Sequence, residues 1–199
     1  CFRCIMNKLI LHLCADMGSD SKPYADAGYD VIKIGKGIGV ENYHPPDNVY
    51  GVIANPPCTM FSCARTKAKT PRDMKEGMRL VQECLRVIWE CQYYKISYNV
   101  PHKLKFWCIE NPATGYLKHY LGEPRLKYCQ SEYGAEFTKL TALWGYFNLP
   151  KQGEKPLTKK PSFGGNYNGA SFDLRFSGDG GGKAVCPPLF AKAFFEANQ

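Results

Sequence analysis

Residues 49–58 read Val-Tyr-Gly-Val-Ile-Ala-Asn-Pro-Pro-Cys, and this stretch decides the fold class of the chain. The apolar, partly β-branched run at its start predicts a buried strand. Asn55-Pro56-Pro57 ends that strand, because proline fixes φ and cannot donate to a strand ladder. Cys58 therefore follows the carboxyl end of a strand, the edge where open α/β sheets bind ligands. A thiol held there on a stiff turn is placed to act as a nucleophile, although a cysteine is more often a small buried hydrophobe.

Residues 105–109, Lys-Phe-Trp-Cys-Ile, predict a second short buried strand. Glu110 follows it directly, so we expect a carboxylate at the same edge of the sheet as Cys58. The alternative role for Glu110 is a solvated acid or the cap of a following helix. If both strands lie in one sheet, a thiol and a carboxylate share one cleft.

The clearest predicted helix runs from Arg72 to Tyr94, where Val81, Leu85 and Ile88 recur at three- and four-residue spacing. This helix links the two strands as a crossover, and strands alternating with helices imply an α/β fold with a mostly parallel sheet. A further helix is expected over residues 191–197.

The length of 199 residues, with 44% hydrophobic content, suits the core of one domain spanning residues 1–199. Residues 164–182 are too rich in glycine for regular structure and predict a mobile loop.

Five segments resemble the DNA cytosine-5 methyltransferases. Residues 56–62, Pro-Pro-Cys-Thr-Met-Phe-Ser, resemble that family's catalytic loop, Pro-Pro-Cys-x-x-Phe-Ser, and residues 110–112, Glu-Asn-Pro, resemble its Glu-Asn-Val element. Residues 11–29 align without a gap with its cofactor-binding strand, loop and helix, and residues 182–191 resemble its closing segment. Residues 133–141 stand in place of its Gln-x-Arg-x-Arg element. The matches keep family order over nearly the whole chain, which resembles a compact phage- or prophage-type member.

The resemblance implies a Rossmann-like, S-adenosylmethionine-dependent methyltransferase fold, with helices on both faces of a mostly parallel sheet. It also implies S-adenosylmethionine as the cofactor and DNA as the partner. By motif position, the residues implied to bind the cofactor are Leu13, Cys14, Ala15, Asp16, Met17, Gly18, Ser19, Lys36, Pro57, Lys183 and Ala184.

The catalytic roles implied by the resemblance agree with elementary chemistry. A Cys58 thiolate adds to C6 of cytosine and makes C5 able to attack a methyl group. Glu110 is the acid near N3, where that addition pushes electrons, and Asn111 orients it. Lys139 and Thr141 replace two arginines, which weakens contacts to the base and to Glu110. Because C5 is inaccessible inside a duplex, the base must be flipped out or already unpaired.

The formal net charge of +8 suits a polyanionic partner, since lysines and arginines that neutralise phosphates release counterions. The basic stretch over residues 65–72 directly follows the expected catalytic loop. The residues expected to contact nucleic acid are Ser62, Arg65, Lys67, Lys69 and Arg72. The alternative is that this stretch is a solvated basic loop.

Several positions depart from the family pattern and make the expected cofactor pocket more basic. His12 replaces an acid at the end of the first strand, and Asp16 replaces a glycine. Lys36 and Gly39 replace two acids near the cofactor, and Lys183 replaces an asparagine. Weak S-adenosylmethionine binding is one consequence. Another is use of a carboxylated analogue, with transfer of a carboxymethyl group, by simple charge complementarity.

Residues 146–181 form the only segment available for target recognition, and they are too short for an ordinary recognition domain. This segment is expected to be a short, loop-rich insert. The enzyme then has little sequence specificity, or a partner or a second copy of the chain supplies recognition.

Two other functions stay open. Asn55-Pro56-Pro57 also resembles the Asn-Pro-Pro-aromatic turn of the amino-methyltransferases, which methylate N4 of cytosine or N6 of adenine, although Cys58 occupies the aromatic position. A non-catalytic nucleic-acid-binding or partner subunit with a decayed cofactor site is the third reading.

Ten cysteines are spread along the chain without the spacing of a disulfide framework, which favours a reducing cytoplasm, that of a bacterial host if the protein is phage-encoded. Cys1 and Cys4 have zinc-like spacing without a second pair, so we expect no metal site. No apolar run is long enough to span a bilayer, so no membrane partner is expected.

Overall fold

The computed structural model describes residues 8–15, 18–63, 65, 68–93, 104–155, 166–167, 170–171 and 185–199. Its main sheet has six strands in the order β2-β1-β3-β4-β6-β5. These strands are β1 (Leu9–Leu13), β2 (Asp30–Ile34), β3 (Val49–Ala54), β4 (Phe106–Pro112), β5 (Leu126–Cys129) and β6 (Leu140–Tyr146). The short strands β7 (Asn166–Tyr167) and β8 (Ala170–Ser171) pair with each other in a separate sheet.

The main sheet is mixed. Neighbours are parallel from β2 through β1 and β3 to β4, whereas β6 is antiparallel to both β4 and β5. The prediction of a mostly parallel sheet is therefore correct for β2, β1, β3 and β4, whereas the reversed strand β6 makes the sheet mixed. The link from β5 to β6, which contains the 3-10 helix η2 (Gln130–Tyr133), is too short for the crossover that parallel neighbours need.

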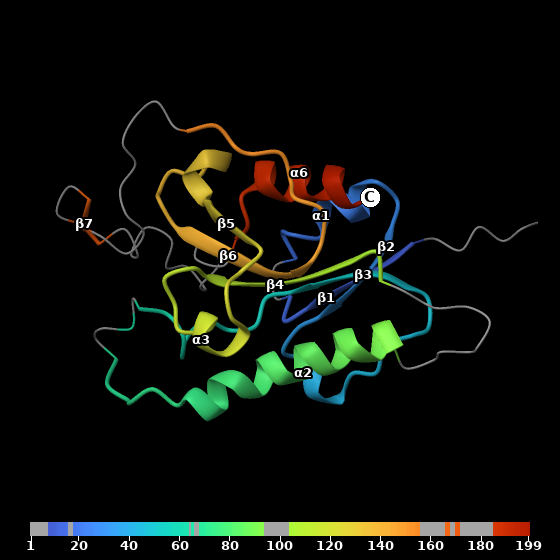
Figure 1. Ribbon diagram of the computed structural model, residues 1–199, viewed down its shortest axis with the longest axis horizontal. Helices are drawn as coiled ribbons and strands as arrows, with labels where there is room; N and C mark the ends of the chain where they lie inside the picture. Colours follow the sequence, from blue (N-terminus) through green and yellow to red (C-terminus); the bar gives the residue numbers. More distant parts are fainter. Residues whose placement is uncertain are drawn as a thin grey trace, which may run out of the picture.

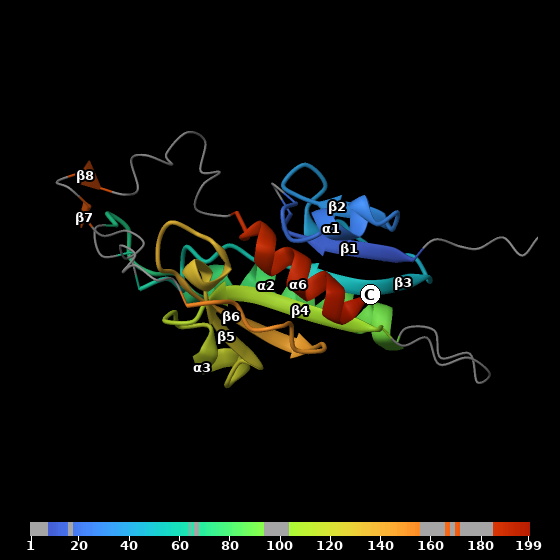
Figure 2. The ribbon, with the colours of Figure 1, turned by 90° about the horizontal axis from the view of Figure 1, so that it is seen from above.

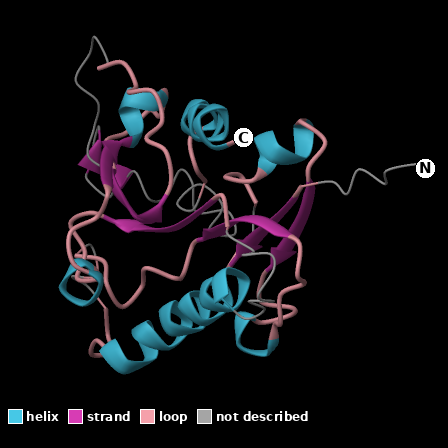
Figure 3. Cartoon of the chain, turned by 45° about the vertical axis from the view of Figure 1, so that its right-hand side comes forward, coloured by secondary structure: helices cyan, strands magenta, loops and turns pink. Residues whose placement is uncertain are grey.

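Helices cover both faces of the sheet, so the molecule has three layers (Figures 1 and 3). On one face lie α2 (Met74–Tyr93) and α3 (Lys118–Leu121); the other carries α1 (Lys22–Asp26) and α6 (Pro188–Asn198). Figure 2 shows α6 above the middle of the sheet. The 3-10 helix η1 (Val40–Asn42) packs beside α2.

The helix α2 matches the predicted crossover. It starts after Asp73, whose Oδ1 accepts a hydrogen bond from the Glu76 backbone N–H at 2.9 Å, as an N-cap does. Its sheet-facing residues recur at three- and four-residue spacing, and the buried ones are Val81, Cys84, Val87, Ile88 and Cys91. The terminal helix α6 starts earlier than predicted, because Pro188 is accommodated in a first helical turn.

The strand β1, between β2 and β3, is buried on both faces of the sheet. Leu11 and Leu13 belong to the core under α2, and Ile10 belongs to the core under α1 and α6. Strand order reverses here, since β2 lies on one side of β1 and β3 on the other. In open α/β sheets the crevice at such a switch point, outside the carboxyl ends of the strands, is the place for a ligand.

Candidate active site

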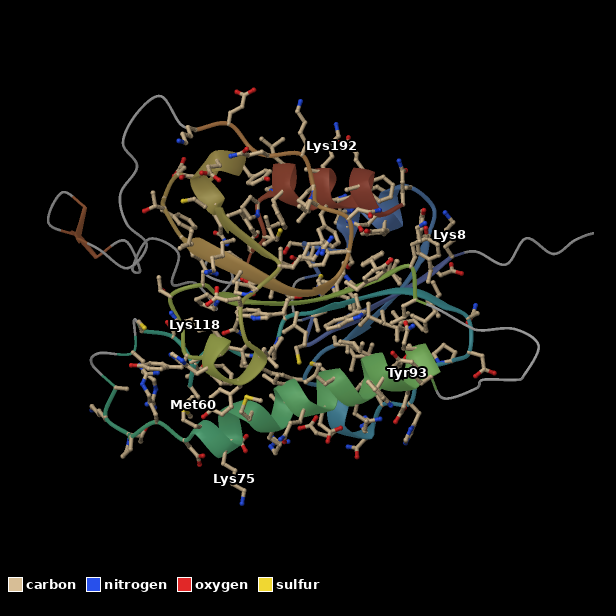
Figure 4. The ribbon with its side chains drawn as sticks, viewed as in Figure 1. Lys8, Met60, Lys75, Tyr93, Lys118 and Lys192 are labelled. Carbon is tan, nitrogen blue, oxygen red and sulfur yellow. The ribbon has the colours of Figure 1, made fainter. Side chains whose placement is uncertain are left out.

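The alternation of side chains along the strands places polar residues from three strands on one face of the sheet. His12, Asn55 and Glu110 lie two residues beyond Ile10, Ile53 and Cys108, which all belong to the core under α1 and α6. Because β1, β3 and β4 are parallel, these polar groups gather at one edge. In Figure 4 this is the end of the molecule that carries Met60 and Lys118, away from Lys8 and Tyr93.

Cys58 lies in a tight turn after β3, as predicted. Its carbonyl accepts hydrogen bonds from the backbone N–H groups of Phe61, at 2.9 Å, and Ser62, at 2.8 Å. Gly77 of α2 lets the helix approach the turn closely, because a Cβ there would lie 2.7 Å from Met60 Cβ. Cys58 is partly exposed and Phe61 is fully buried, so the turn is anchored in the core while the thiol stays accessible.

Arg72 clamps this turn. Its guanidinium donates to the carbonyl oxygens of Met60 and Ser62, each at 2.8 Å, and lies over the Tyr116 ring at 4.8 Å. The Tyr116 backbone N–H in turn donates to the Phe61 carbonyl at 2.9 Å. The loop that carries Cys58 is thus bound both to the start of α2 and to the segment after β4.

Glu110 and Lys139 form an ion pair, and both charges act on the Cys58 thiol. Lys139 Nζ lies 4.0 Å from Glu110 Oε1, and the two side chains are 15% and 19% exposed, so a ligand can reach both. Burial raises the pKa of the Glu110 carboxyl, against the opposing effect of Lys139. Burial also raises the pKa of Cys58; Lys139 lowers it and Glu110 raises it. The carboxyl, the ammonium and the thiol are therefore close enough to influence one another electrostatically.

Glu110 is within β4 rather than after it. The strand was expected to end at Ile109, but pairing with β6 extends it to Pro112, opposite Thr141. That antiparallel partner is not visible in the local sequence.

Asn111 does not orient Glu110, contrary to the role expected for it. Neighbouring residues of a strand point to opposite faces, and the Asn111 side chain donates instead to the Pro56 carbonyl at 3.0 Å. It is fully buried, and its Oδ1 has no hydrogen-bond partner within the described part of the chain. Asn111 therefore supports the turn that presents Cys58.

Asn55 follows β3 at the same edge as Glu110, and it was not among the residues predicted for this site. Asn55 lowers the pKa of Glu110, a smaller effect than those of burial and of Lys139. The Asn55 amide also lies 3.5 Å from Asp20 Oδ2, and its Oδ1 lies 2.8 Å from His12 Nε2. One sign of this polar network was visible in the sequence, because His12 interrupts the leucine-rich run of residues 9–13.

The residues expected to bind a cofactor border the switch point, starting with the end of β1. Leu13 is fully buried, and the Ala15 N–H donates to the Ile34 carbonyl of β2 at 3.1 Å. Cys14, between them, has a left-handed φ of 55° and lies 3.8 Å from Cys84, sulfur to sulfur. A non-glycine residue with positive φ is typical of functional sites, because the surroundings must impose it.

The loop after β1 continues along the same crevice. Gly18 has a φ of 74°, and a Cβ there would lie 2.5 Å from Lys33 Cδ, so the Lys33 stem crosses this glycine. Ser19 Oγ accepts the backbone N–H of Cys186 at 3.0 Å, which joins the segment before α6 to this loop. Lys33, not foreseen from the sequence, adds a cation beside His12, whose pKa it lowers less than burial does.

The remaining residues expected to bind the cofactor either are exposed or lie outside the described part of the chain. Lys36 and Pro57 are exposed. Asp16, Met17, Lys67, Lys183 and Ala184 lie outside the described residues, as do Cys1, Cys4 and most of the glycine-rich loop over residues 164–182.

The residues expected to contact nucleic acid differ in their availability. Lys69 is exposed, and Arg65 donates to the carbonyl and hydroxyl oxygens of Thr70, at 2.8 and 2.7 Å. Arg72 uses two of its donors on the carbonyl oxygens of Met60 and Ser62, in the turn that follows Cys58.

Neither a protein-family model nor a curated protein matches this chain. Within the described ranges, no three His, Cys, Asp or Glu side chains are grouped so as to hold a metal ion. None of the helices in those ranges combines the length and apolar character that crossing a membrane requires.

Proposed function

We propose that the protein is a DNA cytosine-5 methyltransferase that uses S-adenosylmethionine. The observation that carries this proposal is the meeting of Cys58, Glu110 and Lys139 at the carboxyl edge of the sheet. The reaction needs a nucleophile for C6 of cytosine and an acid for N3 within one accessible site. A partly exposed thiol beside a carboxyl of raised pKa meets both needs.

In the proposed mechanism, the Cys58 thiol first loses its proton to solvent; the thiolate sulfur then forms a bond to C6, and the C5–C6 π electrons shift toward N3. Glu110 donates a proton to N3, which leaves C5 enamine-like and nucleophilic. Lys139 stabilises the Glu110 carboxylate that results. After C5 has been alkylated, a base removes the C5 proton, the C6–S bond breaks with its electron pair returning to sulfur, and N3 returns its proton to Glu110.

The crevice between β1 and β3 suits a bound S-adenosylmethionine. Gly18 has a left-handed φ of 74°, which glycine adopts without strain, and Asp20, with a side chain that is 16% exposed, provides a carboxylate at the same edge. Leu13, Ala15 and Gly18 would then border the cofactor. When bound, S-adenosylmethionine supplies an electrophilic methyl group.

The hydrogen bonding of Asn55 argues against the amino-methyltransferase alternative. In that chemistry the asparagine amide oxygen accepts a hydrogen bond from the exocyclic amine of the target base. Here Asn55 Oδ1 lies 2.8 Å from His12 Nε2, so this acceptor is already engaged inside the protein. Cytosine-5 transfer makes no such demand on Asn55.

The test is mass spectrometry of nucleosides in DNA from cells that express the parent protein, Cys58→Ala or Cys63→Ala. Cys63 is an exposed cysteine of the same loop, so it is the matched control. We expect 5-methylcytosine with the parent and the control and none with Cys58→Ala. N4-methylcytosine or N6-methyladenine that persists in Cys58→Ala would assign the protein to the amino-methyltransferases instead. 5-Carboxymethylcytosine would point to the carboxylated cofactor, and no modified base to a binding role.

A further inference from the structure

Two exposed tyrosines, Tyr116 and Tyr120, border the turn that presents Cys58. Their exposed fractions are 41% and 49%. The Tyr116 backbone N–H donates to the Phe61 carbonyl at 2.9 Å, and the Tyr120 ring lies edge-on to the Phe61 ring, with 6.4 Å between the centroids. Phe61 is fully buried, and its own N–H donates to the Cys58 carbonyl at 2.9 Å. Both tyrosines are thus attached to the turn through one anchored residue.

A further contact fixes the segment before these tyrosines to the same loop. The Cys63 thiol donates to the Thr114 carbonyl at 2.8 Å. A Cβ on Gly115 would lie 3.1 Å from the Phe61 carbonyl oxygen, so the two backbones approach closely there. The tyrosine rings are therefore held beside the turn with the thiol, and a nucleic acid strand that delivers a base to Cys58 lies within reach of them.

The surface around the two rings carries positive charge. Lys118 separates the tyrosines in the sequence, and residues 114–121 include no aspartate or glutamate. The Arg72 guanidinium lies over the Tyr116 ring at 4.8 Å. In Figure 4, Lys118 lies at the same end of the molecule as Met60 of the turn. Cations interleaved with exposed aromatic rings are typical of surfaces that bind single-stranded nucleic acids.

A nucleic acid suits this surface better than a second copy of the chain. The formal net charge is +8, so a second copy brings like charges together, whereas a polyanion has the complementary charge. In a duplex the bases stack on one another, but an unpaired strand offers its base faces to the tyrosine rings. Stacking is also tolerant of sequence, which agrees with the short segment over residues 146–181 that is available for target recognition.

We propose that Tyr116 and Tyr120 form a stacking platform for unpaired bases beside the target cytosine, and that the substrate is single-stranded DNA. Lys118 contacts a phosphate of the same strand. The inference rests on the proposed function in one respect, namely that a base of this strand reaches Cys58. The platform itself binds DNA without any chemistry, so its test does not depend on methyl transfer.

The first test measures by fluorescence anisotropy the affinity for labelled oligo(dT) of about 12 nucleotides, a probe without cytosine. We expect the parent to bind it about tenfold more tightly than the oligo(dA)·oligo(dT) duplex of the same length. Tyr116→Ala and Tyr120→Ala should each weaken binding of the single strand about tenfold, because each removes the partner of one stacked base. Tyr116→Phe and Tyr120→Phe keep the rings and should stay within about twofold of the parent.

Tyr93→Ala is the matched control. Tyr93 is 45% exposed and is the last residue of α2, at the opposite end of the molecule from Lys118 (Figure 4). Its loss should leave the affinity for oligo(dT) unchanged. The proposal fails if Tyr93→Ala weakens binding as much as Tyr120→Ala does, or if neither Tyr116→Ala nor Tyr120→Ala weakens it.

The salt dependence of binding separates stacking from charge. Lys118→Ala should reduce the slope of log affinity for oligo(dT) against log salt by about 0.7, as the loss of one phosphate contact on a single strand does. Tyr120→Ala should lower the affinity and leave that slope unchanged. An equal change of slope in the two variants would show that Tyr120 does not act by stacking.

A measurement on the parent protein covers the case in which a variant does not fold. Ultraviolet irradiation of the complex with oligo(dT) should cross-link thymine to the peptide that contains Tyr116 and Tyr120, which mass mapping identifies. Cross-links confined to other peptides would overturn the proposal.

The outcomes also separate the platform from the proposed function. If the parent makes no 5-methylcytosine but its affinity for oligo(dT) depends on Tyr116 and Tyr120, the proposed function fails and the platform is supported. If the parent methylates a duplex faster than the single strand and its affinity for oligo(dT) is insensitive to both tyrosines, only the platform is overturned. Sedimentation as a dimer that Tyr120→Ala converts to a monomer would assign this surface to a second copy of the chain instead.

Discussion

Asn111 Nδ2 lies 3.0 Å from the Pro56 carbonyl oxygen, and this buried hydrogen bond joins β4 to the turn that presents Cys58. Asn111 and Glu110 are neighbours in β4, so their side chains point to opposite faces of the sheet. The turn with Cys58 is therefore held from the face opposite to the Glu110 carboxyl. Stability and reactivity of the turn are consequently linked through Asn111.

Asn111→Ala should destabilise the protein by about 1–3 kcal/mol, because the Pro56 carbonyl loses its buried donor. Asn111→Asp should be worse still, since it buries a carboxylate against a carbonyl oxygen. Thermal unfolding of the two variants beside the parent measures this order. A variant Asn111→Ala as stable as the parent would contradict the supporting role.

Arg72→Lys should lower the rate of methylation while leaving the salt dependence of DNA binding unchanged. A lysine keeps the positive charge but lacks the planar fork with which Arg72 reaches both Met60 and Ser62. Lys69→Ala is the comparison, because this exposed lysine should reduce the slope of log affinity against log salt by about 1. The prediction fails if Arg72→Lys also reduces that slope.

The pH dependence of Cys58 alkylation should shift in opposite directions in two variants. The thiolate is the reactive form, so a higher pKa moves the rate curve to higher pH. Lys139 lowers the pKa of Cys58 and Glu110 raises it, so Lys139→Met should move the curve to higher pH and Glu110→Gln to lower pH. Mass mapping of the alkylated peptide separates Cys58 from Cys63. Shifts in the same direction would mean that the two charges do not act on the thiol.

Cys14→Gly should be more stable than Cys14→Ala, by about 1 kcal/mol, which reverses the usual order. Both variants lose the contact with Cys84, so they differ chiefly in backbone preference at a φ of 55°. Chemical unfolding of the two variants checks the difference. Alanine at least as stable as glycine would show that this φ is not maintained in solution.

The parts of the fold that the sequence predicted well are those with strong local signals. β3 is a continuous apolar run ended by prolines, and α2 repeats its apolar residues at helical spacing, so neither needs information from elsewhere in the chain. β4 was predicted too short, because its last residues are held by β6, which is distant in sequence.

The candidate site shows the same division. Cys58 and Glu110 were found because a stiff turn and a motif mark them locally. The contact of Asn55 with His12 required knowing that β1 and β3 are neighbours, and the actual partner of Asn111 required knowing which face of β4 it lies on. Lys33 was missed because its relation to Gly18 comes from the packing of β2 beside β1.

The antiparallel direction of β6 determines which residues can reach the carboxyl edge of the sheet. In a wholly parallel sheet, only residues that follow strands reach the carboxyl edge, as Asn55 does after β3. A strand that runs the opposite way starts at that edge, so the residue before β6, Lys139, arrives beside Glu110 from the other chain direction. The positions of Glu110 and Lys139 can therefore change independently, because different chain connections place β4 and the start of β6.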